Sequence, residues 1–310
     1  MFSYRHAFHA GNHADVLKHA VLVQLLSHLN LKDAPYWVID THAGAGIYDL
    51  RGEWATGKPA ARSGVRRPSD APPEAAVAAP PRKPESEDGV LRLRSAENPP
   101  GLVQAYLDAL VPFNPDGELR FYPGSPWLTL QAMRERDRLR LFELHPNEID
   151  VLQRNLAQHP RGRSRQVMVK QEDGFEGIKA LLPPPTRRGL VLIDPSYENK
   201  QDYRHTLTAV QEGLKRFSTG TFAVWYPLVA RREVQMLTRT LEHLDVVWVH
   251  ASLQVRRPPS SGYGMYGSGM FVVNPPWTLH DALSGALPWL VATLGQDAGA
   301  TFSLSRSKRS

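Results

Sequence analysis

The hydrophobic positions of this chain fall into two alternating kinds of segment, short apolar runs and longer stretches with helical spacing. Apolar runs of strand length occur at 36–40, 138–144, 165–173, 189–194 and 220–228. Elsewhere, apolar residues at helical spacing predict helices at 14–30 (amphipathic), 101–111, 146–159, 174–182, 202–217 and 230–244. Because strands and helices alternate, the pattern predicts an α/β fold whose parallel sheet is covered on both faces.

The C-terminal part departs from this alternation. Two strands, 246–255 and 268–277, follow one another with no helix between them, and a last helix is expected at 278–294. Two successive strands predict an antiparallel hairpin that closes one edge of the sheet. Seven strands with this ending are typical of class I S-adenosylmethionine-dependent methyltransferases with a Rossmann-like sheet. A nicotinamide dehydrogenase would more often continue with strand, helix and strand.

Two segments lack apolar periodicity. Residues 57–88 are rich in Pro, Ala and charged residues, so they bury too little apolar surface to offset the entropy of ordering. We therefore expect a flexible loop there. The tail at 296–310, which ends in SLSRSKRS, is expected to be disordered.

Composition narrows the class of protein. With 310 residues and 42% hydrophobic residues, the chain can form a sizeable globular core. It has no cysteine, which excludes disulfides, iron–sulfur clusters and thiolate zinc sites and fits a reducing cytoplasm. The chain has no apolar run of membrane-spanning length and no signal-peptide core, so we expect a cytoplasmic protein. We also expect it to be a monomer. The net charge of +6 only slightly favours a polyanionic partner.

A turn of small residues follows the first strand. The sequence DTHAGAG, residues 40–46, places Gly44 and Gly46 where a backbone could approach a ligand closely. It is not a G-x-G-x-x-G motif, and an ordinary tight turn would explain it equally well. Glu143 and Asp173 end the next two strands, where they could accept the ribose hydroxyls and the adenine amino group of a nucleoside. Each could instead cap a helix.

The strand at 189–194 ends in Asp194-Pro195-Ser196-Tyr197. The lone pair of an exocyclic amino group is delocalised into its base, and two acceptors directed at its hydrogens would localise that lone pair. The Asp194 carboxylate and the Pro195 carbonyl could be those acceptors, and Tyr197 could stack on the base. A base in a duplex would first have to be flipped out. An Asx-Pro turn with a buried tyrosine is the structural alternative.

A second segment, VVNPPW at 272–277, matches the Asn/Asp-Pro-Pro-aromatic pattern more closely by its letters. If its strand is antiparallel to the others, its end points away from the ligand-binding edge. We therefore expect 274–277 to be a structural turn and Asp194 to be the functional residue.

Several of these segments together resemble a known family, the ribosomal RNA large subunit methyltransferase J family. The similar segments are YRHAFHAGNHADVLKH, DTHAGAG, YPGSP, ELHP, DGF, RRGLVLIDPSY and SGMFVVNPPW, and the resemblance covers nearly all of the chain except 57–88. It implies methylation of the N6 atom of an adenine in 23S rRNA, with S-adenosylmethionine as donor. It also implies a methyltransferase domain of residues 1–50 and 137–295, and an inserted helical subdomain at 51–136.

The resemblance also implies roles for individual residues. Asp194 would be the catalytic acceptor. The residues expected near the cofactor include His19, His42, Ser125, Glu143 and Asp173, and those expected near the active site and the RNA are Tyr4, His6 and Lys18. Without cysteines or carboxylates at ligand spacing, we expect no metal among the N-terminal histidines His6, His9, His13 and His19.

One position departs from the family pattern. The motif of the family reads Asp-Pro-Pro-Tyr, and this chain has Ser196 in place of the second proline. The change frees one φ angle and is expected to cost about 1 kcal/mol of loop order. We expect methylation to be retained but slower.

Other functions remain open from the sequence. The same chemistry would serve adenine in DNA or a glutamine side chain of a protein. A protein that binds RNA without catalysis could also use this fold as a platform.

Overall fold

The computed structural model describes residues 6–51, 84–159 and 165–307 of the chain. Tyr4, which we predicted near the RNA, lies outside the described residues, as does most of the segment 57–88. His6 begins the first helix.

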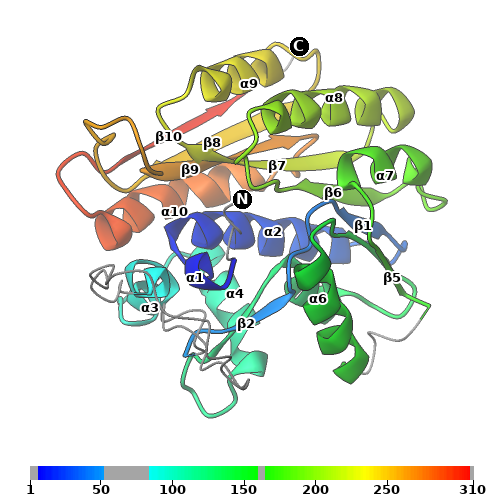
Figure 1. Cartoon of the computed structure of the whole chain (residues 1–310), viewed down its shortest axis with the longest axis horizontal. Coiled ribbons are helices and arrows are strands. Elements are labelled where there is room, and N and C mark those ends of the chain that lie inside the picture. The colour runs from blue at the N-terminus through cyan, green and yellow to red at the C-terminus, as the bar shows by residue number, and fades with distance from the viewer. Residues whose placement is uncertain (1–5, 52–83, 160–164, 308–310) are drawn as a thin grey trace, which may run out of the picture.

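One large sheet forms the centre of the molecule (Figure 1). It has eight strands in the order β10-β8-β9-β7-β6-β1-β4-β5. Their bounds are β1 Trp37–Asp40, β4 Arg138–Phe142, β5 Val167–Lys170, β6 Gly189–Ile193, β7 Thr221–Leu228, β8 Trp248–Gln254, β9 Gly267–Val273 and β10 Thr301–Arg306. Each neighbouring pair from β7 to β5 is parallel, and β9 runs antiparallel to both β7 and β8. The predicted α/β class and the antiparallel hairpin are therefore confirmed.

Helices cover both faces of the sheet, with α8 and α9 above it and α2 and α10 below it in Figure 1. Every residue of the central strand β6 is buried, which explains its uninterrupted apolar sequence. The helices are α1 His6–His9, α2 His13–Asn30, α3 Val90–Arg94, α4 Gly101–Leu110, α5 Ser125–Ala132, α6 Pro146–Gln158, α7 Gly174–Leu181, α8 Gln201–Arg216, α9 Arg232–Glu242 and α10 Leu279–Leu294.

The C-terminal tail differs from its prediction. We expected disorder over 296–310, but residues 301–306 form β10, the edge strand of the sheet. The strand pairs antiparallel with β8, from Thr301 opposite Gln254 to Arg306 opposite Val249. Most of its side chains are exposed, so the backbone hydrogen bonds offered by β8 order this segment. Composition does not reveal such an edge, and the sheet has eight strands instead of the predicted seven.

Residues between β1 and β4 add small elements that the apolar pattern did not predict. Strands β2 Ile47–Asp49 and β3 Phe121–Pro123 pair antiparallel, and η1 Glu85–Asp88 and η2 Val111–Phe113 are short 3-10 helices. Part of the segment predicted as a flexible loop therefore has a defined place. Within η1, the Glu85 carboxylate bonds His9 Nδ1 at 2.8 Å and accepts from Asn12 Nδ2 at 2.9 Å.

Helix α2 lies in the middle of the fold. We predicted an amphipathic helix, but α2 is buried on most of its circumference, including the polar residues His13, Lys18 and His19. The reason is that β9 packs on one side of α2 while α4 and α5 pack on the other. Side chains of the inserted segment, among them Val103 and Tyr106, belong to the same hydrophobic core as the sheet.

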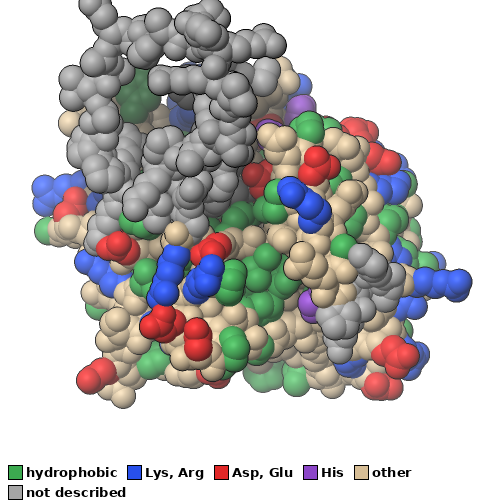
Figure 2. Space-filling model, turned by 60° about the horizontal axis from the view of Figure 1, so that its bottom comes forward, with side chains coloured by type: hydrophobic (Ala, Val, Ile, Leu, Met, Phe, Trp, Pro, Cys, Tyr) green, Lys and Arg blue, Asp and Glu red, His purple; other side chains and the backbone are tan. Residues whose placement is uncertain are grey.

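Acidic and basic side chains are interspersed on the face that Figure 2 presents, wherever described residues form that surface. The positive net charge is therefore not gathered into one basic patch on this face. No helix in the described part of the chain is long and apolar enough to cross a membrane.

Gly46, in the turn after β1, has a packing role. Its φ is 83°, and a Cβ built there would lie 2.6 Å from Trp127 and 2.9 Å from Leu152. We predicted that Gly46 lets the backbone approach a ligand. In the structure, the space that a side chain at this position would occupy is filled by residues of α5 and α6.

We predict that Gly46→Ala lowers the free energy of unfolding by about 2–5 kcal/mol. Left-handed backbone costs about 1–2 kcal/mol for a residue other than glycine, and overpacking adds about 1–3 kcal/mol. Gly117→Ala is the matched control, because its φ is also 83° but nothing lies within 4 Å of a Cβ there. Urea unfolding of both variants separates the cost of the left-handed backbone from the cost of overpacking. Equal losses of unfolding free energy in the two variants would show that packing against Trp127 contributes nothing.

Candidate active site

Four acidic side chains gather at one edge of the sheet. Asp40 ends β1, and Glu143, Asp173 and Asp194 follow the ends of β4, β5 and β6. These strands are neighbours in the order β6-β1-β4-β5 and run parallel, so their carboxyl ends meet at the same edge. Ligands of open α/β sheets bind beyond this edge.

The turn after β1 is tied to the end of β4. Gly44, with φ 58°, donates its N–H to Glu143 Oε2 at 2.8 Å, and His145 N donates to Glu143 Oε1 at 2.8 Å. The carboxylate of Glu143 is half-buried and can accept further hydrogen bonds, because a carboxylate has about four acceptor sites. Glu143 is thus held by backbone N–H groups and still presents acceptors beside Gly44.

Asp173 caps the helix that follows β5. Its Oδ1 accepts from Phe175 N at 2.8 Å, while the side chain is exposed at the sheet edge. The ring of Phe175 lies 4.8 Å from the ring of His42, centroid to centroid. The capping alternative from the sequence is therefore confirmed for Asp173, and its second oxygen faces no partner among the described residues.

A small cavity lies between the glycine turn and α2. The residues that line it include Lys18, His19, His42, Gly44, Tyr48, Ser125 and Asp194. Ser125 Oγ donates to Asp40 Oδ2 at 2.6 Å, and His19 Nδ1 bonds the Tyr122 hydroxyl at 2.7 Å. Burial raises the pKa of Asp40 to about 6. Predicted residues from four distant parts of the sequence therefore share one cavity.

A buried ion pair joins α2 to the end of β6. Lys18 Nζ donates to Asp194 Oδ2 at 2.6 Å and lies 2.7 Å from Asp15 Oδ1. Asp15 also accepts from Gly11 N at 2.9 Å through Oδ2. Within the described part of the structure, Asp194 accepts hydrogen bonds through Oδ2 and none through Oδ1.

The three charges shift one another's protonation. Burial raises the pKa of Asp194 to about 7, although the Lys18 ammonium acts in the opposite direction. Burial by itself would lower the pKa of Lys18, but Asp15 and Asp194 together hold it well above its usual range. Despite burial, Lys18 holds the pKa of Asp15 below its usual range. Lys18 therefore stays charged, and Asp194 is the member of the group that titrates near neutrality.

Tyr197 does not lie where we predicted. Its φ is 54°, and its ring is only 2% exposed and packs against Tyr203 at 4.5 Å between centroids. The hydroxyl donates to the Trp225 carbonyl at 2.8 Å. The left-handed backbone turns the side chain into the core, so the predicted stacking of Tyr197 on a base is wrong for this structure. Tyr197 instead anchors the loop of Asp194 and Pro195, and Ser196 is exposed.

A second small cavity on the other side of Lys18 contains residues that sequence reasoning missed. Asp194 and Pro195 line it together with Asn12, Asp15, Trp225 and Met265. The indole N–H of Trp225 is buried and has no hydrogen-bond partner among the described residues. Asp15 could have been found from its position three residues before Lys18 on one helix face. Trp225 and Met265 had no local signal.

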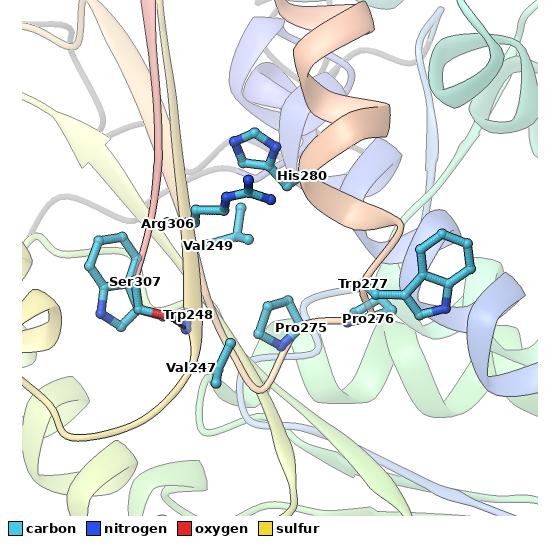
Figure 3. Close-up of a pocket in the computed structure, with 9 residues that line it drawn as sticks. All are labelled: Val247, Trp248, Val249, Pro275, Pro276, Trp277, His280, Arg306 and Ser307. Carbon is cyan, nitrogen blue, oxygen red and sulfur yellow. Dashed lines mark hydrogen bonds between the residues drawn. The ribbon is translucent and has the colours of Figure 1, made fainter. Parts of the chain in front are cut away.

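The segment 274–277 lies at the opposite edge of the sheet, as predicted. Asn274 follows the antiparallel strand β9, and its Nδ2 donates to the carbonyls of Ser218 and Gly220, which precede β7. Figure 3 shows Pro275 near Val247, with Pro276 and Trp277 farther along the chain toward α10, and all four line a pocket there. Asn274 is thus bound to backbone as part of a turn, away from Asp194.

No group of three or more His, Cys, Asp or Glu side chains that could hold a metal ion occurs within residues 6–51, 84–159 and 165–307.

Comparison with known proteins shows the family to which this chain belongs. A model of the family described as ribosomal RNA large subunit methyltransferase D, RlmJ, matches residues 74–304. The chain belongs to this family. Ribosomal RNA large subunit methyltransferase J of Escherichia coli (strain K12) is 40% identical over 297 residues, which cover 95% of this chain and 94% of the relative.

Two further proteins are similar to this chain over nearly its whole length. The enzyme of the same name from Haemophilus influenzae is 39% identical over 295 residues, with 95% of this chain and 94% of the relative covered. A protein from Legionella pneumophila with a known crystal structure is 32% identical, with a TM-score of 0.79 over 96% of this chain and 98% of that chain. The protein is therefore a methyltransferase by family, with the class I Rossmann-like fold that we predicted.

We predict that two substitutions shift the pKa of Asp194 in opposite directions. Lys18→Met removes a cation and should raise this pKa by roughly 1 or more, and Asp15→Asn removes a like charge and should lower it. Carbon-13 NMR titration of the aspartate carboxyls measures both shifts in samples shown to be folded by their unfolding midpoints. Lys179→Met, whose partner is the exposed Glu176, is the control and should leave Asp194 unchanged. Parallel shifts in both variants would contradict the three-charge arrangement.

Proposed function

We propose that this protein transfers a methyl group from S-adenosylmethionine to the N6 atom of an adenine in 23S rRNA. The observation that carries the proposal is the Asp194 carboxylate of Asp-Pro-Ser-Tyr, which is buried at the sheet edge and bonded to Lys18 through one of its two oxygens. Membership in the RlmJ family supports rRNA as the substrate, because the curated relatives are named as methyltransferases of large-subunit rRNA.

The residues along the sheet edge fit S-adenosylmethionine. Glu143 presents carboxylate oxygens next to the Gly44 backbone, and Asp173 presents one exposed oxygen at the neighbouring strand end. These acceptors suit the two ribose hydroxyls and the adenine amino group of a nucleoside. His19, His42 and Ser125 line the cavity between these carboxylates and Asp194. The cofactor would supply an electrophilic methyl group on its sulfonium.

Asp194 and Pro195 would act on the amino group of the substrate. Asp194 Oδ1 and the Pro195 carbonyl are two acceptors on one rigid turn, and Pro195 fixes its own φ. Hydrogen bonds from both N6 hydrogens to these acceptors would localise the nitrogen lone pair and aim it at the methyl group. The contribution is positioning and electrostatic stabilisation set up before the reaction.

Lys18 would hold the acceptor in place. Its bond to Asp194 Oδ2 restrains the carboxylate through one oxygen, and Oδ1 would then accept from the substrate amino group. The ammonium also lies 5.7 Å from the centre of the Trp225 ring, which gives the cation a second contact on the cavity wall. We predicted Lys18 near the active site and the RNA, and this contact with Asp194 supports the first of these places.

We predict that Asp194→Asn lowers kcat for methylation of adenine by about 10²–10³-fold, the usual loss when one preorganised electrostatic interaction is removed. The asparagine amide keeps the shape of the side chain, but it has only one oxygen and cannot accept hydrogen bonds at both positions. Radiolabelled methyl transfer to unmodified, protein-free 23S rRNA, followed by nucleoside analysis, measures the effect. Asn274→Ala is the control at the opposite sheet edge and should match the wild type.

The same assay separates the alternative substrates. DNA that contains adenine and a protein substrate with an accessible glutamine side chain are tested beside the rRNA. Label on DNA or protein but not on rRNA would overturn the proposed substrate. A wild-type protein that binds the cofactor and labels none of the three would favour an RNA-binding role without catalysis.

We predict that kcat/KM rises with pH through about 7 and then levels off. The carboxylate form of Asp194 is the acceptor, and burial raises its pKa to about 7, so the active form increases as pH rises. In Lys18→Met the rise should move to higher pH, because the carboxylate loses its stabilising cation. A profile whose midpoint is unchanged in Lys18→Met would contradict the assignment of this titration to Asp194.

A further inference from the structure

We propose that the loop between β8 and β9, residues 256–265, binds the single-stranded RNA that flanks the target adenine. Tyr263 would stack on a flanking base, and Arg256 and Arg257 would contact phosphates. This inference rests on the proposed function, because it assigns a binding surface for the same RNA substrate.

The topology puts this loop beside Asp194. Because β9 runs antiparallel to both β7 and β8, β8 runs in the same direction as β7 and β6. The end of β8 therefore lies at the edge where Asp194 ends β6. The base of the loop is closed by a hydrogen bond from Val255 N to the Tyr266 carbonyl at 2.9 Å. Met265 lines the same small cavity as Asp194, Pro195 and Trp225, so the loop forms part of the wall of that cavity.

Tyr263 stands at the tip of this loop and is 85% exposed, the most exposed of the large hydrophobic side chains in the described residues. It lies between Gly262 and Gly264, whose φ values of 72° and 102° favour glycine. A Cβ at Gly262 would meet nothing within 4 Å. Tyr263 is two residues before Met265, which lines the cavity. Its two neighbours in the sequence are glycines, so no adjacent side chain covers its ring. Base stacking on an exposed aromatic ring tolerates any sequence, which suits a flanking nucleotide.

Two cations sit at the start of the loop. Arg256 and Arg257 are both exposed, and Arg256 Nη2 donates to the Met265 carbonyl at 2.8 Å, which ties the charge to the cavity wall. Burial lowers the pKa of His13 to about 4, and the Arg256 guanidinium adds to the lowering, so this charge lies near the start of α2. Asp297 is the nearby acid, and it accepts from the backbone N–H of Arg257 at 3.1 Å. The Arg257 guanidinium has no ion-pair partner among the described residues and remains able to bind phosphate.

The pocket at the opposite sheet edge supplies matched controls. Trp277 is 74% exposed there, and Arg306 lies on the same pocket wall (Figure 3). They resemble Tyr263 and Arg257 in chemistry but lie far from Asp194 in the topology. Substitutions at the two edges therefore test position as well as residue type.

The experiment measures binding and methylation of unmodified, protein-free 23S rRNA by the full-length protein. Tyr263→Ala should raise KM and the Kd from filter binding by about tenfold with kcat little changed, as expected when one stacking ring is removed. Tyr263→Phe keeps a ring and should restore both values. The variant with Arg256→Gln and Arg257→Gln should reduce the slope of log Kd against log salt by about 0.7 for each phosphate that the loop no longer neutralises. Trp277→Ala and Arg306→Gln should match the wild type.

The outcomes separate this inference from the proposed function. If the wild type methylates the rRNA and Tyr263→Ala behaves like it, the loop inference is overturned and the function stands. An equal loss in Trp277→Ala would also overturn the inference, because the effect would not depend on the catalytic edge. If the wild type binds but does not methylate, and binding still depends on Tyr263, the loop inference stands and the function falls. A wild type that does neither overturns both.

Discussion

The ion pair between Lys18 and Asp194 links the N-terminal helix to the end of the central strand β6, across 176 positions of sequence. Both side chains are nearly excluded from water, and burying an unpaired charge would cost several kcal/mol. The ammonium that α2 brings therefore stabilises the charged form of Asp194 at the sheet edge. Asp15, one turn earlier on α2, holds the other side of Lys18 and ensures that the cation stays charged.

The position of α2 in turn depends on the inserted segment. The helix carries buried polar residues as well as leucines, and the sheet alone would leave one of its sides in water. Helix α4 and the Tyr106 and Tyr122 hydroxyls close that side, and Tyr122 bonds His19 at the cavity. The insertion thus supports the active site by completing the shell around α2, in addition to any contact of its own with a substrate.

In the loop after β6, the backbone directs neighbouring residues to different surroundings. Asp194 and Pro195 face the cavity, while the positive φ of Tyr197 turns its ring away from the cavity and into the core. The hydroxyl then holds the Trp225 carbonyl of the adjacent strand, and Arg231 Nη1 donates to the Tyr197 carbonyl at 2.9 Å. We expected Tyr197 to contact the substrate, but in this structure it instead anchors the loop that carries Asp194 and Pro195.

Local patterns along the chain were enough to predict the alternation of strands and helices, the acidic residues at successive strand ends and the distinction between Asp194 and Asn274. These follow from local periodicity and from the rule that parallel strands end at one edge. The folded chain was needed to see that Lys18 contacts Asp194, that Trp225 and Met265 line the cavity, and that residues 301–306 form an edge strand. These interactions join segments that are distant in the sequence, and neither burial nor strand pairing leaves a periodic signal in either segment alone.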